Sequence, residues 1–302
     1  MADVPFTPLP IDGPWAIGVS GGADSVALLR LTSARGVAVH AVHLDHETRD
    51  GGSTADAAFV TDLCAELRVP LTVVKRSELE GECAALPDNA SARFRRLRHE
   101  LFRQACGRHG LAGVLLAHHA DDQAETVLHR LLRSGGIAGV GGMRTDARVG
   151  GLRIVRPLLG ARAEELRNYL RGLGQAWRED STNASAEYLR GRLRHALADR
   201  PALVARLIEL GDAMRELGDR VRDATPVLGE SFGAAELAAL PDVLADEAAR
   251  RWLVTRGAPA DDVSPAVVAR LVAMARDAAA PRRRHFPGRV LVVRKKGVIS
   301  RG

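Results

Sequence analysis

The sequence contains little cysteine, few aromatic residues and almost no lysine. Its three cysteines stand apart without a C-x-x-C pair, which favours neither a disulfide framework nor a thiolate metal site and suits a reducing cytoplasm. No apolar run approaches the roughly 20 residues that span a bilayer. The first residues lack the basic and apolar regions of a secretory signal. We therefore expect a cytoplasmic protein without a membrane segment.

Positive charge comes almost entirely from arginine. The formal net charge is +6, and only three of the 43 basic residues are lysine. Clustered arginine neutralises phosphates and releases counterions, which is typical of proteins that bind nucleic acid. Solvated surface charge in an arginine-rich chain explains the total equally well, so the placement of the charges has to decide.

Short apolar runs alternate with longer helical patterns from residue 15 to about 160. Strands are expected at 15–19, 37–44, 71–74 and 113–117, and helices at 24–34, 53–68, 90–109 and 121–133. This alternation predicts an α/β fold, a Rossmann-like parallel sheet with helices on both faces. Ligands of such sheets bind at the carboxyl ends of the strands. The stretches SGGADS, HLDHETRDGG and AHHADDQAET all begin at such an end.

The pattern becomes mainly helical after the apolar stretch LRIVRPLL (152–159). Helices are expected at 161–173, 187–198, 201–222, 234–255 and 263–277, followed by one or two short strands. We expect a first domain over 1–200 and a smaller, mainly helical domain over 201–302. The second ends in a dense basic group, which favours nucleic acid over a random surface. The group comprises Arg282, Arg283, Arg284, Arg289, Arg294, Lys295 and Lys296.

A glycine-rich turn, SGGADS (20–25), follows the first expected strand and has three interpretations. Gly18 to Gly22 fit G-x-S-x-G, the elbow that exposes a hydrolase's nucleophilic serine. That elbow comes after several strands and needs neither Asp24 nor Ser25. A phosphate-binding turn uses every residue, since glycines let the backbone approach a ligand and a helix N-terminus favours anions. A Mg²⁺ ion between Asp24 and the phosphates would complete it, and a merely structural capped turn is the third interpretation.

Four stretches together resemble one family. SGGADS resembles the S-G-G-x-D-S signature of the PP-loop ATP pyrophosphatases, which split ATP into AMP and pyrophosphate while adenylating a substrate. Three further stretches are similar to the tRNA(Ile)-lysidine synthases of that superfamily. They are VHLDHETR (42–49), AHHADDQAETVLHRLLRSGGIAGVGGM (117–143) and REDSTNASAEYLRGRLRHAL (178–197). All four lie in order within the first 200 residues.

The resemblance implies a reaction and its participants. A wobble cytidine in the CAU anticodon of an isoleucine tRNA is adenylated at its C2 oxygen by ATP with Mg²⁺. The amine of free lysine then displaces AMP and gives lysidine. Residues 1–200 would be the PP-loop nucleotide-binding catalytic domain, and 201–302 the domain that binds tRNA.

The resemblance also assigns the nucleotide-binding residues. The turn would hold the pyrophosphate and its Mg²⁺ through Ser20, Gly21, Gly22, Ala23, Asp24 and Ser25, with Asp24 as the metal ligand. His43 and Asp45 end the second expected strand, where the adenosine of ATP could contact them. Ordinary polar loop residues are the alternative for this pair.

Six catalytic residues are expected, five of them besides Asp24. His118, Asp122 and Glu125 are spaced i, i+4 and i+7, so they share one face if the helix begins near 118. In the family the matching positions lie in the active site, and we assign Glu125 to the lysine substrate and Asp122 to a general base or electrostatic partner. The spacing also fits a solvated acidic helix N-terminus, and His119 could equally be the functional histidine.

Two arginines complete the expected set. Arg98 matches the A-R-x-x-R-Y pattern of the family and would stabilise the adenylated cytosine or the α-phosphate, although Ser91 and His99 stand where Glu and Tyr are usual. Arg190 follows Tyr188 and shares a helix face with Arg194. We expect one arginine of this group, Arg190, to reach the active site and the others to hold tRNA phosphates.

Four other functions compete with this interpretation. A tRNA thiolase usually employs a cysteine pair or cluster, which this sequence lacks. A GMP or NAD synthetase would lack the 117–143 and 178–197 stretches. A serine hydrolase conflicts with the position of the turn. An RNA-binding module with a dead nucleotide site conflicts with the presence of Asp24, His118, Asp122 and Glu125.

Overall fold

The chain forms two compact units. The computed structural model describes all residues except 1–3, 11–12, 48–51, 84–85, 133–136 and 180–188. The first unit comprises 1–129 and 142–209, and the second comprises 130–141 and 210–302. Within the described parts of the chain, no helix is both long and apolar enough to cross a membrane. The predicted boundary at residue 200 between two functional domains stays a prediction.

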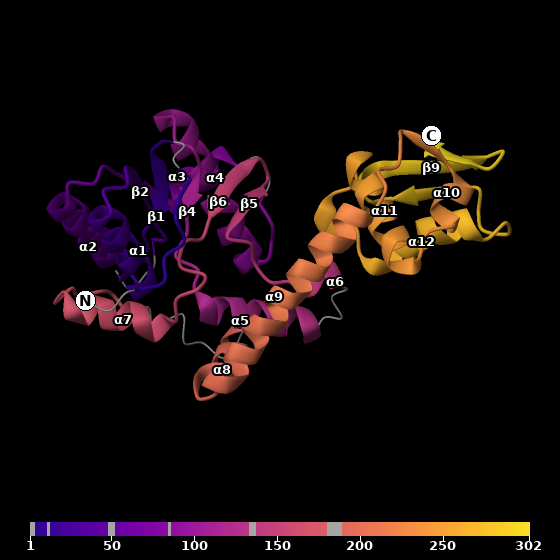
Figure 1. Ribbon diagram of the computed structural model, residues 1–302. Helices are drawn as coiled ribbons and strands as arrows, with labels where there is room; N and C mark the ends of the chain where they lie inside the picture. Colours follow the sequence, from indigo (N-terminus) through magenta and orange to yellow (C-terminus); the bar gives the residue numbers. More distant parts are fainter. Residues whose placement is uncertain (1–3, 11–12, 48–51, 84–85, 133–136, 180–188) are drawn as a thin grey trace. The chain divides into compact units, whose positions relative to one another are not determined.

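A six-stranded sheet lies at the centre of the first unit (Figure 1). Its strands are β1 (Trp15–Gly18), β2 (Val39–Asp45), β3 (Leu71–Lys75), β4 (Val114–Leu115), β5 (Asp146–Val149) and β6 (Leu152–Val155). Their order is β3-β2-β1-β4-β6-β5, and only β5 runs antiparallel to its neighbour. The parallel strands therefore bring the ends of β1, β2 and β4 to one edge, where ligands of such sheets bind.

Helices cover both faces of this sheet. They are α1 (Ala23–Ala34), α2 (Gly52–Leu67) and α7 (Ala163–Gly172) on one face, and α3 (Arg76–Glu82) and α4 (Ala90–His109) on the other. Two further helices of the unit are α5 (Ala120–Leu132), which follows β4, and α8 (Leu189–Ala198). Alternate residues of β1 serve the two faces. Trp15 and Ile17 pack with α1, α2 and α7 in one core, whereas Ala16 packs with α3 and α4 in the other.

Local signals fix the ends of α4, which spans the predicted residues 90–109. The side chain of Asn89 caps its start by accepting a hydrogen bond from the Ala92 N–H at 3.1 Å. Gly110 ends it in the left-handed conformation, with φ +61°, which a glycine adopts without strain. The helix therefore holds its arginines at defined positions beside the sheet.

The second unit packs helices against an antiparallel sheet in the order β7-β10-β9-β8. Its elements are α6 (Ile137–Val140), the later part of α9 (Pro201–Ala224), β7 (Ser231–Gly233), α10 (Ala234–Ala238), α11 (Asp242–Thr255), α12 (Pro265–Arg276), β8 (Arg283–Phe286), β9 (Val290–Lys295), β10 (Val298–Arg301) and the 3-10 turns Ala260–Asp262 and Pro287–Arg289. Its core centres on Trp252, whose ring meets Phe232 edge-on at 5.3 Å.

The structure confirms the predicted fold class and corrects several elements. The helix expected over 234–255 is two helices, because Pro241 interrupts the hydrogen-bonding pattern. The end of the chain contributes three strands rather than one or two, and Ser231–Gly233 adds a fourth. Helix α3 and strand β5 were not predicted, since both are short and carry little apolar periodicity.

Candidate active site

The glycine-rich turn lies between the end of β1 and the start of α1. The Ser25 hydroxyl donates to the Gly22 carbonyl at 2.9 Å, accepts from the Ser20 N–H at 3.1 Å, and lies 3.2 Å from the Ser20 hydroxyl. Gly21 adopts φ +93°, a conformation that favours glycine, and its carbonyl accepts from the Arg178 N–H at 2.9 Å. These bonds form a tight turn that opens a helix, as a phosphate site requires.

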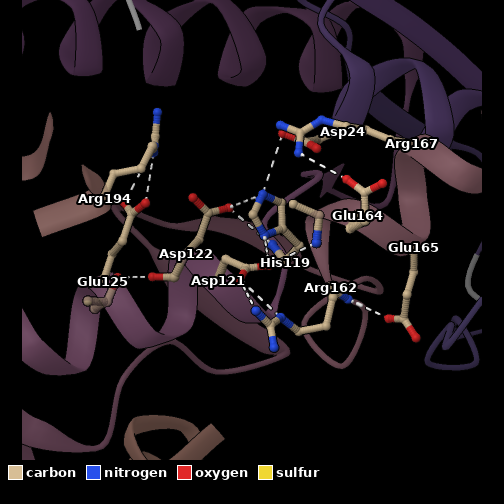
Figure 2. A network of polar contacts seen from close by, with 12 residues as sticks. Asp24, His119, Asp121, Asp122, Glu125, Arg162, Glu164, Glu165, Arg167 and Arg194 are labelled. Atoms are coloured by element: carbon tan, nitrogen blue, oxygen red, sulfur yellow. Dashed lines mark hydrogen bonds and ion pairs between the residues drawn. The ribbon is translucent and has the colours of Figure 1, made fainter. Parts of the chain in front are cut away.

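His119 lies among three carboxylates at the start of α5 (Figure 2). Its Nε2 is 3.5 Å from Oδ2 of Asp24 and 3.5 Å from Oδ2 of Asp122, while Nδ1 is 3.6 Å from Oδ2 of Asp121. Burial alone would lower the pKa of His119, but the carboxylates of Asp121, Asp24 and Asp122 raise it to about 10. The imidazole thus joins the glycine-rich turn to α5.

His118 does not share a helix face with Asp122 and Glu125, because α5 begins only at Ala120. The prediction that His118, Asp122 and Glu125 share one helix face is therefore wrong for His118. It holds for Asp122 and Glu125, which are three residues apart on α5. The Nδ1 atom of His118 instead accepts from Nε of Arg156 at 3.2 Å. Of the two histidines, His119 contacts Asp24 and Asp122 directly. The catalytic role expected of His118 stays a prediction.

Glu125 is buried and pairs with an arginine from α8. Its Oε1 accepts from Nε of Arg194 at 2.8 Å, and only 4% of its side chain is exposed. Burial alone would lower the pKa of Arg194, but the hydrogen bond to Glu125, the largest cause, raises it. The sequence prediction chose Arg190 for this region, but the side chain of Arg190 lies outside what the structure describes. The four-residue spacing that puts Arg194 on the same helix face was the available signal.

His43 and Asp45 lie at the carboxyl end of strand β2, as predicted. The Nδ1–H of His43 donates to the Val19 carbonyl at 2.8 Å, and its buried Nε2 has no partner among the described residues. Asp45 accepts from the Glu47 N–H at 2.9 Å. Burial alone would raise the pKa of Asp45, but hydrogen bonds from Glu47 and Ser53 hold it below its usual value. Their contact with adenosine stays a prediction.

Arg98 lies on α4 with an exposed side chain, one residue after the fully buried Leu97. The next residue, His99, stands where the family usually has Tyr. Its Nε2–H donates to the Val149 carbonyl at 2.8 Å and so ties α4 to β5. This departure therefore has a structural role here, and the predicted contacts of Arg98 with substrate stay a prediction.

Comparison with known proteins identifies the nucleotide-binding part. The family model for the PP-loop domain matches residues 10–201, almost two thirds of the chain. The chain belongs to the PP-loop domain family. The turn Ser20–Ser25, called the PP-loop below, lies within the matched residues, and the cluster around His119 contacts it through Asp24.

Named relatives agree with this membership. The chain is 42% identical over 212 residues to the tRNA(Ile)-lysidine synthase of Symbiobacterium thermophilum, covering 66% of this chain and 43% of that protein. It is 35% identical over 299 residues to the enzyme of that name from Thermus thermophilus, covering 95% of this chain and 56% of the relative. The chain thus spans about half the length of these relatives.

A solved structure shares the fold at low sequence identity. It is the U34-tRNA thiolase NcsA from Methanococcus maripaludis, with a TM-score of 0.56 and 15% identity over 72% of this chain and 74% of that one. At such identity the likeness concerns the fold alone. It agrees with the mostly parallel sheet of the first unit.

The PP-loop offers a metal ion one carboxylate ligand, Asp24, and not a full set of protein ligands. Among the described residues, no group of three or more His, Cys, Asp or Glu side chains is arranged to hold an ion. However, Oδ1 of Asp24 is buried without a hydrogen-bond partner there. Mg²⁺ commonly binds through one or two carboxylates together with substrate phosphates. Asp24 therefore suits Mg²⁺ that arrives with a nucleotide.

Sequence reasoning did not assign roles to Asp121 and Arg162. The side chain of Arg162 donates to Oδ1 of Asp121 from Nε at 3.0 Å and from Nη2 at 2.7 Å. Burial alone would raise the pKa of Asp121, but His119 and Arg162 hold it well below its usual range. Because the two residues lie 41 positions apart, no local pattern could reveal the pair.

Proposed function

We propose that this chain is a tRNA(Ile)-lysidine synthase. It adenylates the C2 oxygen of the wobble cytidine in an isoleucine tRNA with a CAU anticodon and releases pyrophosphate. Free lysine then attacks C2 through its amine, forms the C–N bond and expels AMP. The observation that carries the proposal is the 35–42% identity to relatives of that name. The reaction would take place in the cytoplasm.

The PP-loop would bind the phosphates of ATP. The N-terminus of α1 and the serine hydroxyls provide donors, and the helix dipole favours an anion there. Asp24 would hold Mg²⁺, which supplies positive charge to the phosphates when bound. The residues contribute by positioning and electrostatics, as in other transfers at phosphorus. His43 and Asp45 would contact the adenosine.

Glu125 and Asp122 would serve the lysine substrate. Glu125 pairs with the guanidinium of Arg194, so a cationic amine that binds this carboxylate would have to share it with the guanidinium or displace it. The incoming amine has to lose a proton before or during attack, and Asp122, three residues away on the same helix, is the proposed acceptor. Arg98 and Arg190 would stabilise the negative charge of the adenylated intermediate.

The second unit would bind tRNA through its basic end. Arg282, Arg283, Arg289, Lys295 and Lys296 are exposed, so their charges are accessible to phosphates. Arg294 is different, because its guanidinium donates to the carbonyls of Met274, Asp277, Ala278 and Ala280. We therefore assign tRNA binding to the exposed residues and a structural role to Arg294. The proposed division remains 1–200 for catalysis and 201–302 for tRNA.

The test is transfer of labelled lysine to a base of tRNA. The purified chain is incubated with ATP, Mg²⁺, radiolabelled lysine and bulk bacterial tRNA, and acid-precipitable label is counted after mild alkaline treatment. That treatment removes ordinary aminoacyl esters but leaves lysine attached to a base. We expect stable label that depends on ATP and disappears in Asp24→Ala.

The outcomes separate the parts of the proposal. Pyrophosphate release without stable lysine would keep the adenylation chemistry and reject lysine as the second substrate. No release and no label with an unmodified isoleucine CAU tRNA would reject the enzyme. Asp62→Ala, an exposed carboxylate change on α2, is the matched control and should retain full labelling.

A further inference from the structure

Asp121 is attached to the start of α7 by several hydrogen bonds (Figure 2). Arg162 donates twice to its Oδ1, at 3.0 and 2.7 Å, and the Ala163 N–H donates to its Oδ2 at 2.8 Å. Ala163 is the first residue of α7, so the carboxylate also faces a helix N-terminus, which favours negative charge. The orientation of Asp121 is therefore fixed from outside its own helix.

Arg162 is itself held in place. Its backbone N–H donates to Oε2 of Glu165 at 2.6 Å, and the preceding carbonyl, that of Ala161, accepts from the Ala120 N–H at 2.8 Å. Helix α7 also packs against α1, the helix that carries Asp24 in its first turn. The guanidinium thus belongs to a segment that is hydrogen-bonded to α5 and is followed by a helix packed against α1.

From Asp121 the contact continues to His119 and the PP-loop. Oδ2 of Asp121 lies 3.6 Å from Nδ1 of His119, and Nε2 on the other side of the ring lies 3.5 Å from both Asp24 and Asp122. Only 9% of the His119 side chain is exposed. These contacts are ion pairs rather than short hydrogen bonds, and together they place a carboxylate on each side of the buried ring.

We propose that Arg162 and Asp121 are positioning residues for the adenylation step. Arg162 fixes Asp121, Asp121 orients the His119 imidazole, and the imidazole sets the place of Asp24 relative to Asp122. The inference rests on the proposed function, since the step it serves is the release of pyrophosphate from ATP.

A purely structural ion pair explains these contacts less well. The side chains of Arg162 and Asp121 are 36% and 26% exposed, and half-exposed pairs add little to stability. The bond between Ala120 and Ala161 already joins α5 to the segment before α7. Beyond that bond, the ion pair directs the carboxylate of Asp121 towards His119.

The test compares Arg162→Gln with Arg167→Gln. Arg167 lies on α7, its side chain is 45% exposed, and it forms a long ion pair of 3.7 Å with Glu164. Arg167→Gln therefore removes one positive charge from the same region but leaves the hydrogen bonds to Asp121 in place. We expect Arg162→Gln to lower kcat for pyrophosphate release about 10- to 100-fold, because small misplacements of reacting groups have effects of that size. The KM for ATP and the Tm should stay close to those of the control.

A second readout follows the imidazole itself. Nitrogen-15 spectra of the histidine rings, with His119 identified by its absence in His119→Asn, should show a shifted His119 signal in Arg162→Gln and an unchanged one in Arg167→Gln. If Arg162→Gln proves unstable, Arg162→Lys takes its place. It keeps the charge but loses the paired donors, and the same loss of kcat is expected.

Two results would overturn the positioning role. One is a kcat equal to that of Arg167→Gln, and the other is an unchanged His119 signal; either shows that Arg162 does not position His119 for the adenylation step. If the wild-type chain releases no pyrophosphate with any tRNA, the proposed function fails. The ring spectra then still decide whether Arg162 orients His119.

Discussion

Arginines of this chain differ in what their guanidinium groups contact. Arg194 pairs with the buried Glu125, and Arg162 donates twice to Asp121. Arg294 donates to four backbone carbonyls and holds the end of α12 near β9. A planar group with several N–H donors can serve all these purposes. The arginine excess of the sequence is therefore not a single nucleic-acid surface.

The thiol of Cys64 should be unreactive in the folded protein. The side chain is 1% exposed, and burial raises its pKa to about 11, so little thiolate forms near about pH 8. We expect a thiol reagent to label Cys64 only after urea is added, as measured by peptide mass spectrometry. Labelling of Cys64 as fast as that of the half-buried Cys83 would contradict this.

Asp121 should make stability depend on pH. Its folded-state pKa lies below the ordinary value of 3.8, so its contribution is fully present above that value and is lost as the pH falls through the folded-state pKa. At neutral pH we expect Asp121→Asn to lower the free energy of unfolding by no more than about 1 kcal/mol, because the ion pair is partly exposed. Urea unfolding at about pH 3 should show a smaller difference between the two proteins.

The opposite trend would contradict this assignment. A difference between wild type and Asp121→Asn that grows towards acid pH would mean that the protonated carboxyl is the favoured form. Asp62→Asn, on the exposed surface of α2, is the control for the removal of one carboxylate.

At the scale of elements, strand β4 depends on close packing of its backbone against β1 and β6. Gly113 precedes this strand, and a Cβ atom there would lie 2.7 Å from the Arg153 carbonyl oxygen and 2.8 Å from the Trp15 ring. Both distances are below van der Waals contact, and the carbonyl belongs to β6. The glycine thus allows β4 to lie between β1 and β6.

Two glycine-to-alanine changes should have opposite effects. Gly113→Ala should lower the free energy of unfolding by about 1–3 kcal/mol, because overpacking forces backbone shifts. Gly107 lies inside α4 with nothing within 4 Å of the added Cβ, so Gly107→Ala should raise it by about 0.5–1 kcal/mol. Urea denaturation measures both. Equal effects would show that the contacts at Gly113 relax without cost.

Long elements could be predicted from the sequence, whereas the contacts between them could not. Both α4 and α1 were predicted closely, α4 because Asn89 and Gly110 mark its ends and α1 because it carries a nearly continuous buried run. The glycine-rich turn between β1 and α1 could be placed from its own letters. The pairs Arg162–Asp121 and Arg194–Glu125 join residues 41 and 69 positions apart. Only the fold brings such partners together, so His119 could not be distinguished from His118 beforehand.

At the scale of the whole molecule, we expect different basic residues of the second unit to serve tRNA binding and stability. The double variant Lys295→Ala/Lys296→Ala removes exposed charges and should weaken tRNA binding with a reduced salt dependence, at unchanged Tm. Arg294→Ala leaves four carbonyls without their donor and should lower Tm. Filter binding at several salt concentrations and thermal unfolding measure the two effects. An unchanged salt slope in the double variant would contradict the assignment.

The packing of α7 on α1 has a consequence for the order of synthesis. Leu166 and Leu170 of α7 belong to the same buried core as Leu28 of α1, and the partner of Glu125 comes from residue 194. Chains emerge from the ribosome N-terminus first, so the PP-loop is made early while its covering helix is made about 140 residues later. A growing chain that already displays SGGADS therefore still exposes an apolar face of α1. The nucleotide site is complete only when nearly the whole first unit has been translated.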